Sequence, residues 1–322
     1  MIIRPRRLRN TQSIRNLTSE TRLSPSMFVY PIFVRQGKNI IEDIPAMPGQ
    51  KRYSPDTLPR ILEKCAKNKI GGILLFGIPE HKDETGSEAY NDNGVIQNAI
   101  KISKREFPDL TVIGDVCLCE YTSHGHCGLI RDNKIDNDST IEILAKVAVS
   151  YANSGADIVA PSDMMDGHTA KIRDELDKNN FPDTLIFSYA VKYSSAFYGP
   201  FREAAGSAPK FGDRKTYQMD YRNVREAIKE AILDVDEGAD MIIVKPAMSY
   251  LDVLKSVKEK IFVPVGAYSV SGEYSMIKAA SANGWLNEKN IVIESAYSMA
   301  RAGADIIISY YSLELAEWIS CS

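Results

Sequence analysis

A short motif, glycine-alanine-aspartate followed by an aliphatic run, occurs three times in the chain. The copies begin at Ser154, Glu237 and Ala302. Glycine just past the end of a helix, then a short turn and a buried strand, is typical of a helix-to-strand connection. Three copies indicate an architecture built from repeated strand and helix units.

Eight segments have the length and aliphatic composition of buried parallel strands. They span Met27–Val34, Gly72–Gly77, Thr111–Leu118, Asp157–Ser162, Leu185–Lys192, Asp240–Pro246, Val263–Val270 and Asp305–Tyr311. Segments with helical periodicity follow them, at Pro55–Lys69, Gly94–Glu106, Ser139–Asn153, Asp163–Lys178, Tyr221–Glu237, Tyr250–Lys260, Glu273–Asn283 and Glu288–Ala302. Eight alternating units predict a (β/α)8 TIM barrel, an α/β fold of roughly 250 residues. A doubly wound sheet is the alternative, because the number of strands does not prove that the sheet closes.

The first 24 residues are rich in arginine and contain one acidic residue, Glu20. They lack the apolar core of a secretory signal, although an organelle presequence has a similar composition. Free termini usually fray unless they pack on something. We therefore interpret residues 1–24 as an N-terminal oligomerisation arm and residues 25–322 as the catalytic barrel domain.

The charge and the cysteine content limit the classes of binding partner and indicate the cellular compartment. The chain has 39 basic and 42 acidic residues, a net charge of −3, and this balance predicts no nucleic-acid partner. No apolar run approaches the ~20 residues that span a bilayer, so we expect no membrane partner. Five cysteines, an odd number, do not form a secreted disulfide framework and indicate a cytoplasmic chain with a metal site.

Two of the expected strands end in a lysine, Lys192 and Lys245. In a TIM barrel the active site lies at the carboxyl ends of the strands. If these strands are neighbours, ~4.8 Å apart, charge repulsion and burial should lower the pKa of at least one amine. A neutral amine can attack a ketone and form a Schiff base. The alternative for each lysine is a structural ion pair with a carboxylate.

Other polar residues at strand ends would line the same mouth. They are Asp115 and Cys117 at the third strand, Ser162 at the fourth, Tyr268 and Ser271 at the seventh, and Tyr310 at the eighth.

Three cysteines, Cys117, Cys119 and Cys127, fall within 11 positions. Two thiolates two residues apart, with a third after a glycine-containing turn, can converge on a soft cation. Zinc suits them, and three ligands would leave its fourth position open, as in catalytic sites. His124 and His126 would be further ligands or supporting groups. Three buried thiols without a metal are the alternative.

The connection Tyr193–Asp220 is too long for a plain loop of a compact domain. Because it follows a strand that ends in lysine, we expect it to form a lid over the site. Arg202 and Arg214 in this loop could clamp a carboxylate bidentately. A solvated basic loop is the alternative interpretation.

Taken together, these residues resemble the porphobilinogen synthase family, also called 5-aminolaevulinate dehydratase, over nearly the whole chain. The motifs that carry the resemblance are Arg6-Arg7-Leu8-Arg9, the cysteine segment Asp115–Gly128, Pro161–Gly167, Lys192–Arg202, Val244–Asp252 and Tyr268–Glu273.

The resemblance implies a TIM barrel whose N-terminal arm wraps a neighbouring subunit, usually in a homo-octamer. It implies a lyase that condenses two 5-aminolaevulinate molecules into porphobilinogen, with loss of two waters, in the biosynthesis of haem and other tetrapyrroles.

The resemblance also implies residue roles. Lys245 matches the lysine that binds the first substrate, at the P site, and Lys192 matches the A-site lysine. Asp115 and Ser162 match polar groups beside the lysines. The groups that hold the substrate carboxylates are matched by Arg202, Arg214 and Gln218 at the A site and by Ser271 and Tyr310 at the P site. Tyr268, next to these, is a further candidate for substrate contact.

The metal residues match in the same way. The three cysteines correspond to the zinc-binding form of the family, rather than the form with aspartates and alanine. Glu230 matches the position where some members bind an allosteric magnesium ion. The sequence without the resemblance indicates only a surface glutamate. His168 stands where magnesium-using relatives often carry arginine.

Two other functions fit part of the pattern. A class I aldolase would use one Schiff-base lysine and leave the other lysine and the cysteines without a role. A catalytically silent, zinc-stabilised assembly module would use the cysteines alone.

Overall fold

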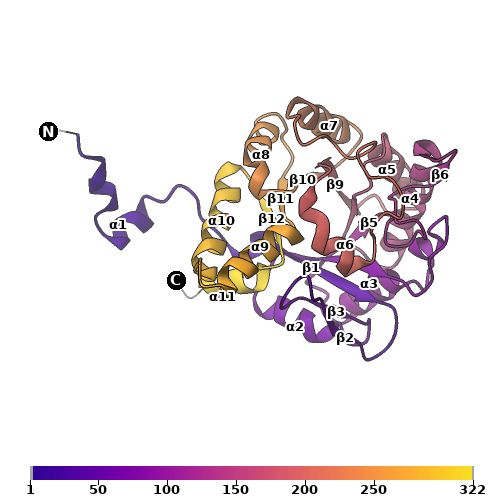
Figure 1. The fold of residues 1–322 in the computed structure, drawn as a ribbon, viewed down its shortest axis with the longest axis horizontal. Coiled ribbons are helices and arrows are strands. Elements are labelled where there is room, and N and C mark those ends of the chain that lie inside the picture. Colours follow the sequence, from indigo (N-terminus) through magenta and orange to yellow (C-terminus); the bar gives the residue numbers. More distant parts are fainter. Residues whose placement is uncertain (1–2, 321–322) are drawn as a thin grey trace.

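The computed structural model describes residues 3–320 (Figure 1). Eight parallel strands form a closed barrel, and each of them pairs with the next barrel strand along the chain. They are β1 Phe28–Arg35, β4 Gly72–Ile78, β5 Thr111–Val116, β8 Ile158–Pro161, β9 Leu185–Lys192, β10 Met241–Lys245, β11 Val265–Ser269 and β12 Ile306–Ser309. β12 pairs back onto β1 through Phe28 with Ile307 and Val29 with Ile308. This pairing confirms the predicted TIM barrel and shows that the open doubly wound sheet is wrong.

Helices surround the barrel on its outer side (Figure 1). The longer ones are α2 Pro59–Lys67, α3 Val95–Glu106, α4 Asn137–Asn153, α5 His168–Lys178, α7 Arg225–Asp236, α8 Leu251–Lys258, α9 Ser271–Ala282, α10 Glu288–Ala302 and α11 Ser312–Ser320. Shorter elements are η1 Pro5–Arg9, α1 Gln12–Leu17, η2 Pro25–Met27, β2 Ile41–Asp43, β3 Lys51–Tyr53, η3 Ser87–Tyr90, β6 Ile130–Arg131, β7 Lys134–Ile135, η4 Ala196–Tyr198, α6 Gly199–Ala205 and η5 Met248–Tyr250. Every predicted helix is present, whereas α11, α1 and α6 were not predicted.

The repeated motif has one structural role at all three positions. Its glycines have positive φ angles, which end the preceding helix. Its aspartates each accept a hydrogen bond from a backbone N–H of the neighbouring strand, which fixes the position of that strand. The pairs, 2.8 Å apart in each case, are Asp157 with Val112, Asp240 with Ile186 and Asp305 with Val265.

The N-terminal segment stands apart from the barrel. Residues 3–24 extend away from it and contain η1 and α1 (Figure 1). None of them is buried, and Ile3, Leu8 and Leu17 expose 78, 58 and 78% of their surface. Residues 1–2 of the expected arm and residues 321–322 of the expected barrel domain lie outside the described part of the chain.

Within residues 3–320, no helix is both long enough and apolar enough to cross a membrane.

Candidate active site

The two lysines lie side by side at the mouth of the barrel. Lys192 ends β9, Lys245 ends β10, and the two are register partners in these adjacent parallel strands. Both side chains are buried, with exposures of 4 and 5%. The structure therefore brings together the two residues that the sequence predicted as neighbours.

Aromatic rings surround the amine of Lys245. Its Nζ lies 4.2 Å from the ring centroid of Tyr268, 4.9 Å from Tyr189, 5.2 Å from Phe201, 5.5 Å from Tyr198 and 6.0 Å from Phe76. Ring faces attract a cation, but burial and the charge of Lys192 act more strongly and lower the pKa of Lys245 to about 7. This confirms the expectation that one amine is readily neutral.

Lys192 has a different environment. Burial lowers its pKa, but the negative charges of Cys127, Cys117 and Cys119 outweigh burial and raise the pKa of Lys192. Its Nζ also donates a short hydrogen bond to the carbonyl oxygen of Ser162. The two amines are thus differentiated, with Lys245 the better nucleophile near neutral pH.

Asp115 and Ser162 lie next to the lysines, as predicted. Ser162 Oγ donates to Asp115 Oδ2 over 3.1 Å, and both residues are buried. Burial and the charge of Glu120 raise the pKa of Asp115 to about 7, although both lysines oppose the shift. Asp115 Oδ1 has no hydrogen-bond partner among the described residues.

The three cysteines converge. Cys117, Cys119 and Cys127 are buried free thiols whose sulfur atoms all lie within 4.8 Å of one another. The Cys117 and Cys119 sulfurs are 3.4 Å apart, near the ~3.8 Å that two thiolates have on one tetrahedral zinc ion. The donor set therefore fits a thiophilic metal and argues against three unrelated buried thiols.

The two histidines do not join this cluster, which leaves the predicted role of supporting groups. His126 Nδ1 lies 3.0 Å from Tyr217 Oη and its Nε2 lies 3.0 Å from the Phe211 carbonyl oxygen. His124 accepts the His126 backbone N–H and contacts the Glu84 carbonyl oxygen. Both rings instead tie the cysteine segment to the neighbouring loops, which sequence spacing could not distinguish from ligation.

The predicted lid covers the site. Its helix α6 carries Phe201 and Arg202, and both line the cavity above the lysines, as Arg214 does. The volume of this cavity is about 10 Å³, room for a single water molecule. In this conformation the lid closes the mouth, so a larger substrate requires it to open.

The two lid arginines and Gln218 have unpaired polar atoms. Arg202 Nε, Arg214 Nε and both polar atoms of the Gln218 amide are buried without a hydrogen-bond partner among the described residues. Burial and the charge of Arg214 lower the pKa of Arg202. The solvated-loop alternative is wrong for Arg214, which is 4% exposed. Such groups are suited to an anionic ligand that brings acceptors.

Ser271, Tyr268 and Tyr310 form the opposite side of the mouth. The hydroxyls of Tyr268 and Tyr310 are 3.3 Å apart, and both rings are buried. Ser271 Oγ accepts the backbone N–H of Phe201 over 2.9 Å and so contacts the lid. Of these three residues, Tyr268 has a direct contact with a lysine, with its ring centroid 4.2 Å from Nζ of Lys245.

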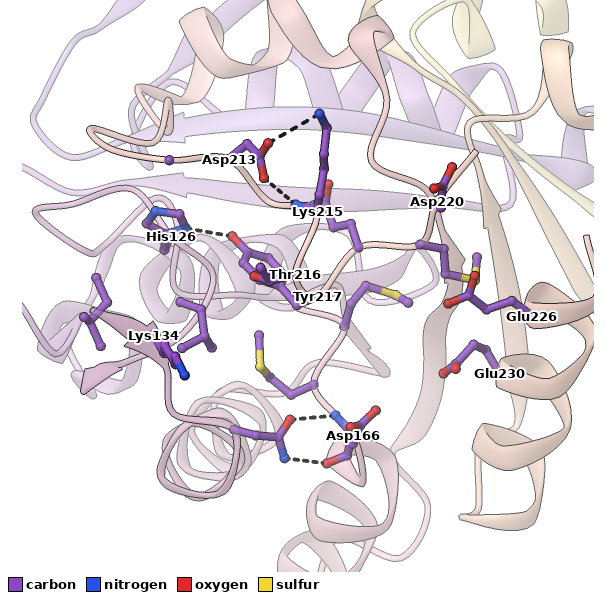
Figure 2. A pocket seen from close by; sticks show the side chains of 18 of the residues that line it. His126, Lys134, Asp166, Asp213, Lys215, Thr216, Tyr217, Asp220, Glu226 and Glu230 are labelled. Atoms are coloured by element: carbon purple, nitrogen blue, oxygen red, sulfur yellow. Dashed lines mark hydrogen bonds and ion pairs between the residues drawn. The ribbon is translucent and has the colours of Figure 1, made fainter. Parts of the chain in front are cut away.

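Glu230 lies outside this mouth, on α7. It lines a cavity of about 870 Å³ that also contains Asp166 and Glu226 (Figure 2). Burial and the charges of Asp234 and Asp166 raise the pKa of Glu230. His168, nearby on α5, is buried between Asp163 and Asp234, at 2.9 and 3.2 Å. Among residues 3–320, Glu230 does not belong to any group of three closely spaced metal-ligating side chains.

Several buried residues of the site were missed in the sequence, among them Phe76, Tyr198, Glu120 and Tyr189. Glu120 lines the cavity and its Oε2 lies 3.2 Å from the Cys119 sulfur; its position directly after Cys119 was the available signal. The ring centroid of Tyr189 lies 4.9 Å from Nζ of Lys245 and 5.7 Å from Nζ of Lys192. Regular strand alternation would place it on the opposite face from Lys192, so the sequence offered no signal for it.

Comparisons with known proteins agree with this geometry. Residues 2–318 match the family model described as Delta-aminolevulinic acid dehydratase. The delta-aminolevulinic acid dehydratase of Bacillus subtilis (strain 168) is 53% identical over 317 residues, covering 98% of both chains. That of Archaeoglobus fulgidus is 53% identical over 315 residues, covering 98% of this chain and 97% of the relative.

Solved structures give the same result. The structure of delta-aminolevulinic acid dehydratase (porphobilinogen synthase) from Toxoplasma gondii, in complex with the reaction product porphobilinogen, has a TM-score of 0.96 and 44% identity, covering 99% of this chain and 92% of that chain. Deoxyribose phosphate aldolase from Aeropyrum pernix has a TM-score of 0.50 at 9% identity and covers 92% of each chain. At that identity the likeness concerns the barrel fold alone.

Proposed function

The chain belongs to the delta-aminolevulinic acid dehydratase family, and we propose that it carries out the family's reaction through Lys245 and Lys192. In this reaction two molecules of 5-aminolaevulinate condense into porphobilinogen and two waters are lost, so the enzyme is a lyase of tetrapyrrole and haem biosynthesis.

One observation carries the assignment of the lysines. Lys192 and Lys245 are paired on adjacent strands, buried, and unequal in charge, because the pKa of Lys245 is lowered to about 7 while that of Lys192 is raised. The neutral amine of Lys245 attacks the ketone of the first substrate and forms a Schiff base. Lys192, which binds the second substrate in the same way, must first release a proton. This difference supports Lys245 as the amine that reacts with the first substrate.

Asp115 and Ser162 are suited to proton transfer beside these amines. They are hydrogen-bonded to each other, and the pKa of Asp115, about 7, lets the carboxyl group give and take protons near neutral pH. Each Schiff base makes the adjacent carbon more acidic, so a carboxylate at this position can remove a proton from that carbon.

The unpaired groups of the lid and the opposite wall orient the two substrates. We assign Arg202, Arg214 and Gln218 to the carboxylate of the second substrate, and Ser271, Tyr310 and Tyr268 to that of the first. Holding both molecules in one closed site removes much of the entropy cost of a reaction between two molecules. The small volume of the closed cavity also excludes water from the imines.

Cys117, Cys119 and Cys127 would hold the catalytic zinc ion. When bound, zinc would act as a Lewis acid toward the amine of the second substrate or a water. The convergence of the three sulfurs supports the site, and the match to a thiolate donor set supports zinc.

Three further features belong to the proposal. Glu230, with Asp166 and Glu226 in the same cavity (Figure 2), would hold an allosteric magnesium ion through a few carboxylates and waters. The exposed apolar residues of the arm, residues 1–24, would pack on a neighbouring subunit of a homo-octamer. Four free cysteines in the described chain support a reducing, cytoplasmic compartment.

The alternative functions explain less of the site. A class I aldolase needs one Schiff-base lysine, whereas this mouth holds two lysines and a sulfur cluster. A silent assembly module would have no need for a buried lysine of lowered pKa or for unpaired arginine groups.

A product assay tests the proposal. The enzyme, loaded with zinc, should convert 5-aminolaevulinate into porphobilinogen, which an aldehyde colour reagent detects, and should not cleave sugar-phosphate ketones. Cleavage of those ketones would favour the aldolase, and an oligomer without turnover of either substrate would favour the assembly module.

A further inference from the structure

The lid helix α6 has different kinds of contact at its two ends. Near its first residue, the ring of Phe201 packs on those of Phe76 and Phe33, with centroids 5.1 and 5.5 Å apart. At its other end the helix presents backbone carbonyl oxygens, because the last four carbonyls of an α-helix have no partner within the helix. The side chains that bind these carbonyls come from outside the lid.

Arg52 binds two of the carbonyls. From its place on β3 it donates through Nε to the carbonyl oxygen of Ala204 over 2.8 Å, and through Nη2 to that of Glu203 over 3.1 Å. The donors of a guanidinium group form a rigid planar fork, so one arginine can bind two successive carbonyls. This fork joins the end of the lid helix to the strand pair β2 and β3.

Glu42 orients the guanidinium group of Arg52. The two residues face each other across the antiparallel strands β2 and β3, and Arg52 Nη1 donates to Glu42 Oε1 over 2.8 Å. The other oxygen of Glu42 pairs with Arg35, on β1. The Arg52 side chain is 14% exposed, so solvent competes little for its bonds to the lid.

Lys82 binds a third carbonyl at the same end of the helix. It lies in the connection after β4, and its Nζ donates to the carbonyl oxygen of Gly206 over 2.8 Å. Gly206 ends α6 in the left-handed conformation, with a φ angle of 59°. Cations are favourable at this end of a helix, since its free carbonyls carry partial negative charge.

Arg202 lies between the two sets of contacts. It directly follows Phe201 and directly precedes Glu203, and it lines the cavity above the lysines. Its Nε is buried without a hydrogen-bond partner among the described residues. The position of Arg202 above the lysines is therefore set by the helix that carries it.

We propose that Arg52 and Lys82 are positioning residues that hold the lid helix closed and so keep Arg202 above the lysines. Both bind backbone carbonyls of α6, so they act on the helix rather than on a single lid side chain. Their part in catalysis rests on the proposed function, whereas their hold on the lid is a property of the enzyme without substrate.

Hydrogen–deuterium exchange of the metal-loaded enzyme without substrate tests this hold. In Arg52→Met and in Lys82→Met, the amides of residues 199–207 should exchange about tenfold faster than in wild type, because each variant loses charged hydrogen bonds that keep the lid closed. Exchange in the barrel strands, bound metal and Tm should stay at wild-type values. Lys82→Arg keeps a cationic donor and should exchange within about twofold of wild type.

Arg35→Met is the matched control. It removes the other cation that shares Glu42, whereas the bonds from Arg52 to the lid remain. Exchange at residues 199–207 should match that of wild type.

Steady-state kinetics connect the lid contacts to the reaction. In Arg52→Met and Lys82→Met, KM for 5-aminolaevulinate should rise about fivefold, with kcat within about threefold of wild type, because Arg202 is less well held while the lysines are unchanged. Faster exchange with an unchanged KM would overturn the positioning of Arg202.

The outcomes separate this proposal from the proposed function. Exchange at residues 199–207 that stays at the wild-type rate in a methionine variant overturns the role of the residue replaced. Faster exchange in Arg35→Met, or over the whole barrel, overturns the proposal as well, because the effect would then be a general loss of stability. Wild-type enzyme that forms no porphobilinogen contradicts the proposed function, and the exchange rates still decide whether Arg52 and Lys82 hold the lid.

Discussion

Lys192 and Lys245 are register partners in the adjacent parallel strands β9 and β10, and this pairing places two buried amines against each other. The charge of Lys192 helps to lower the pKa of Lys245 to about 7. The geometry of one strand pair therefore produces both the nucleophile and its partner.

The first prediction concerns pH. The amine of Lys245 is half neutral near pH 7, so its reactivity should rise with pH through about 7 and level off above it. Relative to pH 8, trapping on Lys245 at pH 6 should be roughly tenfold slower. Initial rates of borohydride trapping, read by mass spectrometry of the Lys245 peptide, measure this profile.

The same profile tests the origin of the shift. Lys192→Met removes a positive charge, so the pKa of Lys245 should rise and the profile should move to higher pH. A profile that stays in place, or moves to lower pH, would show that Lys192 does not lower this pKa.

The second prediction concerns the metal. Replacing Cys117, Cys119 or Cys127 by serine should lower bound zinc from one ion per chain to a small fraction, measured by elemental analysis. Cys65→Ala is the control, since Cys65 is buried but lies outside the cluster, and it should retain the metal. Full zinc content in all three serine variants would place the metal elsewhere.

The third prediction concerns the carboxylate clamp. Arg202→Lys keeps the charge but loses the planar pair of donors. Losing a charged hydrogen bond of about 2 kcal/mol should raise KM for 5-aminolaevulinate roughly 30-fold. Arg222→Lys, at an exposed arginine paired with Asp220, should leave KM unchanged. Equal KM values for the two variants would exclude the clamp.

The fourth prediction concerns the arm. Deleting residues 1–24 should leave the barrel folded, because none of the described arm residues is fully buried and only Leu23 among them is a partly buried apolar residue packed against the core. The assembly should break down into smaller species, as measured by size-exclusion chromatography with light scattering. An unchanged particle mass, after allowing for the deleted residues, would contradict the role of the arm in assembly.

The barrel and its lysines were predictable because their signals are local. Buried parallel strands read as continuous aliphatic runs, and the lysine that ends β10 breaks such a run. The spacing of the cysteines likewise indicated their convergence. The closure of the sheet had no local sequence signal, since it depends on the pairing of β1 with β12, which lie at nearly opposite ends of the chain.

The remaining features depend on irregular backbone. Tyr189 could not be assigned because a β-bulge in β9 reverses the alternation that sequence reading assumes. His126 could be predicted only as either a ligand or a supporting group, because its partners, Tyr217 and Phe211, come from the lid about 90 residues later. Neither relationship can be read from the spacing of residues along the chain.

Borohydride trapping with 5-aminolaevulinate, followed by mass mapping of the modified peptide, tests the central claim most directly. The account predicts an adduct on Lys245 at low substrate concentration, and loss of this adduct and of turnover in Lys245→Ala, which should keep its fold and zinc. An active Lys245→Ala variant, or wild-type enzyme without an adduct on Lys245, would contradict it.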